Sequence, residues 1–89
     1  MHVLDEYGYQ ITKREAAKRE RLKREAENFS ARFPIGTRVK YVKILTGTVA
    51  DDEWIYSTIT SPAWVLGHHS VVVNMEHERC FHTTHIRKA

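Results

Sequence analysis

The pattern of apolar and polar positions changes near residue 30. Residues 11–29 contain no glycine or proline and consist mostly of strong helix formers. Thr12, with Glu15 three positions later, has the spacing of a capping box at a helix start. Pro34 disfavours helical backbone at the residue before it and supplies a stop. The pattern therefore predicts one helix over residues 11–29, preceded by an irregular lead-in at residues 5–10 that lies on the rest of the fold.

Beyond Pro34, apolar and β-branched residues occur in short runs that turn residues separate. Strands are expected within residues 37–45, 54–66, 71–75 and 80–83, and Pro62 interrupts the second run. Four or five short strands in about 55 residues, after one helix, is the count of a small β-barrel. The sequence thus predicts an α+β fold that is mainly β, with a helical segment at 1–33 and a barrel at 34–89.

The size of the predicted barrel makes the helix part of the fold. A domain of about 60 residues buries only about 60% of its unfolded surface and is marginally stable alone. A helix packed across one face or open end of the barrel adds to that burial. The apolar residues expected to make this contact are Ile11, Leu22, Ala26, Phe29 and Phe33.

Composition narrows the class of protein. The 89 residues carry a formal net charge of +3, and no apolar run approaches the ~18 residues that a membrane span needs. The first six residues lack the basic and apolar regions of a signal peptide. A lone cysteine, Cys80, excludes an intrachain disulfide and fits a reducing compartment. These features predict a small soluble cytoplasmic protein.

A resemblance gives the barrel a more specific form. The segment 33–39, Phe-Pro-Ile-Gly-Thr-Arg-Val, resembles the entry strand of an SH3-like barrel, and Trp64, Gly67, the strand at 71–73 and the closing segment 85–87 follow a similar layout. The chain also resembles small proteins of phages and prophages that join such a barrel to a helical extension. Because barrels of this kind bind RNA, DNA, peptides or protein surfaces, the resemblance implies a binding role and leaves the partner open.

The charged residues of the predicted helix are unevenly distributed around it. At 100° per residue, five cations share an arc of about 140°, interrupted only by Glu25. The residues predicted to bind nucleic acid or another anionic partner are these five and three cations of the first strand: Lys13, Arg14, Lys18, Arg21, Arg24, Arg38, Lys40 and Lys43. The opposing interpretation is an ordinary solvated helix, since seven cations and four anions leave residues 11–29 with a net charge of only +3.

Two other interpretations stay open. The acidic trio Asp51, Asp52 and Glu53, beside Trp54, could imitate phosphate in an inhibitor that binds a host protein, as small phage anti-defence proteins do. The chain could also be a structural subunit of an assembly, and its own oligomeric state is open.

Four residues within nine positions invite a metal interpretation: His77, Cys80, His82 and His85. Zinc binds thiolate and imidazole, but its ligand pairs usually stand 12 or more residues apart on separate elements. We therefore expect no metal here, and instead a hairpin with exposed histidines and a buried Cys80.

The sequence gives no support for a catalytic site. There is no glycine-rich phosphate loop and no flanking pattern of a cysteine nucleophile. The entry phrase at 33–39 also resembles that of the type II dihydrofolate reductases. Where their Val-Gln-Ile-Tyr strand would lie, this chain has Val-Val-Asn-Met at 72–75, so the match fails at the active pore. We therefore expect a binding protein without cofactor or catalysis.

Overall fold

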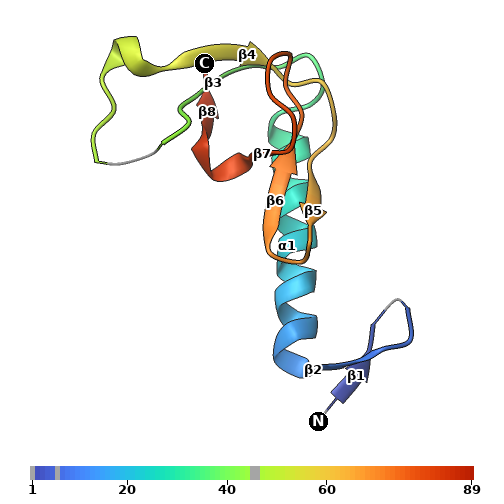
Figure 1. Ribbon diagram of the computed structural model, residues 1–89. Coiled ribbons are helices and arrows are strands. Elements are labelled where there is room, and N and C mark those ends of the chain that lie inside the picture. Colours follow the sequence, from blue (N-terminus) through green and yellow to red (C-terminus); the bar gives the residue numbers. More distant parts are fainter. Residues whose placement is uncertain (1, 6, 45–46) are drawn as a thin grey trace.

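The computed structural model describes residues 2–5, 7–44 and 47–89 (Figure 1). Within these ranges the chain forms one helix and eight short strands in three small sheets, which confirms an α+β fold made mainly of strands. The elements are β1 (His2–Leu4), β2 (Gln10–Thr12), α1 (Lys13–Arg32), β3 (Arg38–Tyr41), β4 (Ile55–Thr58), β5 (Trp64–Leu66), β6 (Ser70–Val73), β7 (Phe81–His82) and β8 (Ile86–Lys88). Short 3₁₀ turns occupy Asp51–Glu53 and Thr83–His85.

The helix begins where its capping signal predicts. The Thr12 hydroxyl accepts a hydrogen bond from the Glu15 amide at 3.1 Å, so the predicted N-cap is confirmed. The helix continues to Arg32 instead of ending at residue 29. Ser30 does not interrupt it, because its hydroxyl accepts the Ala63 amide at 2.9 Å instead of competing for the helix backbone.

The N-terminal segment differs from the predicted irregular lead-in. β1 and β2 form an antiparallel ribbon that pairs Val3 with Ile11, and Figure 1 shows it beside the start of α1, away from β3, β4 and β8. The turn between the strands is closed by Asp5, whose amide donates to the Tyr9 carbonyl at 2.8 Å, and by Gly8, whose φ is +84°. The predicted irregular backbone is present at residues 5 and 7–9, but the Asp5–Arg19 ion pair holds this segment beside the start of the helix and not on the sheets.

The remaining strands form two three-stranded antiparallel sheets, in the orders β4–β3–β8 and β5–β6–β7. The predicted break at Pro62 is present, since β4 ends at Thr58 and β5 begins at Trp64. A single bridge between Ile59 and Met75 connects the strands of the two sheets. Among the described residues no closed barrel is found, so the SH3-like barrel stays a prediction. The strand expected within residues 37–45 ends at Tyr41, and its predicted end at residue 45 lies outside the described residues.

Buried apolar residues gather in two clusters. The larger draws on both sheets and on the end of the helix, and consists of Phe33, Val39, Tyr41, Ile59, Val73, Met75 and Ile86. In the smaller cluster, Leu22 and Ala26 of α1 pack on Val71 of β6, beside Ala63 and Val65. Of the five contacts predicted between the helix and the barrel, Leu22, Ala26, Phe29 and Phe33 belong to or pack against these clusters. Ile11 is buried, but it lies in β2 opposite Val3 and in neither cluster. The helix is thus held to the sheets along one side.

Candidate nucleic-acid interface

The five predicted helix cations lie on the exposed side of α1. Because Leu22 and Ala26 face the sheets, residues on the remaining arc of the helix point to solvent. Every member of the predicted set on the helix is exposed. We call this set the basic face: Lys13, Arg14, Lys18, Arg21 and Arg24.

Ion pairing distinguishes the basic face from Arg19 on the same helix. Arg19, which is half-buried on the packed side of the helix, donates from Nη1 to Asp5 Oδ2 at 3.1 Å. In contrast, no residue of the basic face forms an ion pair with a carboxylate in the part of the chain that the structure describes. Like charges spaced i,i+4, such as Arg14 and Lys18, repel mildly.

The Asp5 carboxylate connects the N-terminal ribbon to the helix. Its Oδ1 accepts the amides of Tyr7 at 3.0 Å and Tyr9 at 2.8 Å, while Oδ2 accepts Arg19. Burial raises the pKa of Asp5, but these hydrogen bonds and the Arg19 charge outweigh it and lower the pKa overall. The carboxyl is therefore anionic at neutral pH, and the ribbon is fixed to the first half of the helix.

A shallow groove of about 350 Å³ borders the basic face at Lys18. Its other wall is the β5–β6 turn, where the His69 amide donates to the Leu66 carbonyl at 3.2 Å. Gly67 and His68 both take left-handed backbone there, with φ of 61° and 62°, and the two imidazoles lie beside the helix. The sequence predicts only a turn at this segment. Its position beside Lys18 comes from helix–sheet packing, which no local signal reports.

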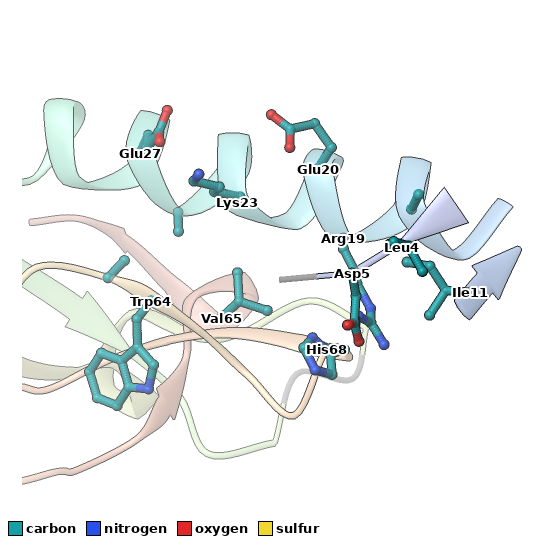
Figure 2. A pocket seen from close by; sticks show the side chains of 13 residues that line it. Leu4, Asp5, Ile11, Arg19, Glu20, Lys23, Glu27, Trp64, Val65 and His68 are labelled. Atoms are coloured by element: carbon teal, nitrogen blue, oxygen red, sulfur yellow. Dashed lines mark hydrogen bonds and ion pairs between the residues drawn. The ribbon is translucent and has the colours of Figure 1, made fainter. Parts of the chain in front are cut away.

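A larger groove, of about 560 Å³, lies between α1, β5 and the ribbon (Figure 2). Its helical rim carries charges of both signs, Glu20, Lys23 and Glu27. Trp64 and Val65 lie across from this rim, and the Asp5–Arg19 pair lies at the ribbon end. The rim of mixed charge makes this groove a weaker site for a polyanion than the basic face.

The three strand cations lie elsewhere, and each has a partner. Lys40 Nζ is 4.9 Å from the Trp54 ring centroid, a cation–π contact. Lys43 Nζ is 3.4 Å from Glu78 Oε1, and Arg38 Nη1 donates to Thr58 Oγ1 at 3.4 Å. Figure 1 shows β3 at the opposite end of the molecule from the start of α1. The structure therefore does not bring the strand cations together with the basic face.

The alternative acidic surface is a compact turn. Asp51, Asp52 and Glu53 form a 3₁₀ turn, and all three are exposed. Trp54, which follows them, is half-buried beneath Lys40. The carboxylates of this turn form no ion pair with a described cation.

The histidine-rich hairpin corrects one prediction. Cys80 is exposed, not buried, because it sits in a bend with φ of 51° where its amide donates to Asn74 Oδ1 at 3.0 Å. His77 and His82 are exposed, and the rings of His82 and His85 are 6.5 Å apart. No group of three or more histidine, cysteine or acidic residues that could hold a metal ion is found among the described residues.

In the described part of the chain no helix is long and apolar enough to cross a membrane. Comparisons with protein-family models, with curated proteins and with solved structures give no match for this chain.

Proposed function

We propose that this protein binds nucleic acid through the basic face of α1 and has no catalytic role. The observation that carries the proposal is the contrast in pairing on one helix. Arg19 on the packed side has a carboxylate partner at 3.1 Å, while five exposed cations on the outer side have none among the described residues. A row of phosphates would supply the missing negative charge and offset the repulsion within the face.

The length of the basic face suits several consecutive phosphates. Lys13 and Arg24 are eleven residues apart, which is about 16 Å along a helix. Phosphates on one strand of duplex DNA rise about 3.4 Å each along the axis while the strand winds around it, so a straight face of this length can contact several phosphates. Because the face is a set of exposed side chains and not a shaped pocket, we expect little sequence preference.

We also infer that the two larger sheets are the halves of an SH3-like barrel. Three features support this: β3 pairs with β8, the last strand of the chain; the Ile59–Met75 bridge joins the sheets; and a 3₁₀ turn precedes β8. The resemblance to small phage and prophage accessory proteins implies the same arrangement. In this proposal the barrel is a scaffold that holds the helix and turns its basic side outward.

The salt dependence of affinity tests the proposal. Fluorescence anisotropy with a labelled 20-bp duplex, between 50 and 200 mM salt, gives the slope of log affinity against log salt concentration. If each cation of the basic face neutralises one phosphate, this slope is about −4.5 on duplex and about −3.5 on a single strand. An affinity that changes little with salt, or no binding at 50 mM salt, would contradict the proposal.

A second candidate function rests on the acidic turn. Asp51, Asp52 and Glu53 present three exposed carboxylates without a described cationic partner, a surface that suits a basic protein partner of the host or of an assembly. Under this alternative, a partner captured by the parent protein is lost from an Asp51→Lys/Asp52→Lys variant. Reversal of charges on the helix would leave that capture unchanged.

A further inference from the structure

We propose that the nucleic acid bound is single-stranded, with its bases stacked on Tyr7 and Tyr9; this inference rests on the function proposed above. The side chains of these two tyrosines are 75% and 71% exposed. Both belong to the turn of the β1–β2 ribbon, directly before the helix that carries the basic face.

The turn holds its two tyrosines in a fixed backbone geometry. One carboxylate, that of Asp5, accepts both tyrosine amides and the Arg19 guanidinium. The Gly8 amide also donates to the Asp5 carbonyl at 3.0 Å. These bonds tie Tyr7 and Tyr9 to the packed side of α1 through Asp5, and both tyrosines are exposed to solvent.

The aromatic turn and the basic face are close along the chain. Tyr9 and Lys13 are four residues apart, a separation that extended backbone spans in at most about 14 Å. The turn lies on the packed side of α1 and the basic face on its outer side, but both reach the N-terminal end of the helix at Lys13, so a strand that leaves the basic face around this end can place its next bases at the turn. Aromatic side chains beside a cationic track are the combination by which proteins hold single strands.

Stacking on the tyrosines favours a single strand over a duplex as the ligand. In a duplex the faces of the bases are covered by their neighbours, so exposed tyrosines gain nothing from it. On a single strand each stacked base contributes roughly five- to a hundredfold in affinity. The tyrosines therefore make the protein select unpaired strands, while the cations supply binding that either form can share.

The test compares three ligands with the full-length protein: a 20-nucleotide oligothymidylate, the same backbone without bases, and a 20-bp duplex. The variant is Tyr7→Ala/Tyr9→Ala. Tyr56→Ala is the matched control, because Tyr56 is 49% exposed on β4 at the other end of the molecule. Circular dichroism checks that each variant keeps the fold, as expected for exposed side chains.

We expect the double variant to lose about tenfold or more in affinity for oligothymidylate, with its salt slope unchanged. Its affinity for the abasic strand and the duplex should equal that of the parent protein, and the control should match the parent on all three ligands. If the double variant binds oligothymidylate as well as the parent does, the stacking inference is wrong while salt-dependent binding still supports the basic face. Equal losses on all three ligands would show that the tyrosines contribute to affinity without contacting bases, and this result would also contradict the stacking inference. If the parent protein binds none of the ligands, both the inference and the proposed function fail.

Discussion

The two ends of the molecule carry cations on exposed or half-exposed surfaces, but the contacts of these cations differ. At the β4–β3–β8 end, Arg38, Lys40 and Lys43 are each engaged by a hydroxyl, an aromatic ring or a carboxylate. At the helix end, the cations of the basic face have no described carboxylate partner. The same residue types therefore have different surroundings at the two ends, and the proposed function assigns binding only to the cations of the basic face.

The two ends also differ in how they are stabilised. The sheet β4–β3–β8 contributes to the larger cluster through Val39, Tyr41 and Ile86. The middle of the helix depends on a smaller contact, in which Leu22 and Ala26 pack on Val71. The orientation of the basic face thus depends on a few apolar side chains.

The largest effect is expected from removing apolar side chains that hold the helix to the sheets: Leu22 belongs to the smaller cluster, and Phe29 packs against the larger one. Leu22→Ala and Phe29→Ala should each lower the free energy of unfolding by about 2–4 kcal/mol, because each removes apolar contact between the helix and the sheets. Urea denaturation measures the change, and Arg21→Ala on the exposed side is the control, with a change within about 0.5 kcal/mol.

A chain that begins at Pro34 extends the same test. Without the helix, Val71 and its neighbours Ala63 and Val65 lose their cover, and we expect poor solubility. If the shortened chain is soluble, monomeric and as stable as the parent protein, the helix is a free arm, and the contrast between the two ends disappears.

A smaller effect is expected at the β1–β2 ribbon when the pH is lowered. The hydrogen bonds of Asp5 lower its pKa below the ordinary value of 3.8, so its contribution is complete above that pH and is lost as pH falls through the folded-state pKa. The amide resonances of Tyr7 and Tyr9 should therefore shift in NMR spectra recorded below pH 3.8, and Asp5→Asn should abolish this titration. Asp51→Asn, at the other end, should leave it unchanged. If the two amides still titrate in Asp5→Asn, a group other than Asp5 causes the shift.

Local signals in the sequence predicted some of these features, and long-range contacts determined the others. The Thr12 cap and the break at Pro62 depend on neighbouring residues, and both are confirmed. The ribbon depends on a bond between Asp5 and Arg19, fourteen residues apart, which no periodicity reveals. The exposure of Cys80 depends on a bend held by Asn74, and a small sulfur-containing side chain alone favoured burial.

In the candidate site, too, local spacing predicted some features and long-range contacts determined the others. Helical spacing predicted that five cations share one arc, and each of them is exposed. The sequence also grouped Arg38, Lys40 and Lys43 with them, because it contains no information on which cations are paired. Glu78 lies 35 residues from Lys43, and Trp54 lies 14 residues from Lys40, so these contacts form only in the folded chain.

Matched charge reversals at the two ends test the central claim most directly. Arg14→Glu/Arg21→Glu on the helix and Arg38→Glu/Lys43→Glu on the strand end change the net charge by the same amount. Affinity for a single strand and for a duplex is measured at several salt concentrations, after circular dichroism has shown that both variants are folded. We expect the helix variant to lose at least about tenfold in affinity and its duplex salt slope to fall in magnitude by about 1.8, while the strand variant keeps the parent slope. Equal losses in the two variants, or a larger loss in the strand variant, would contradict the assignment of binding to the basic face.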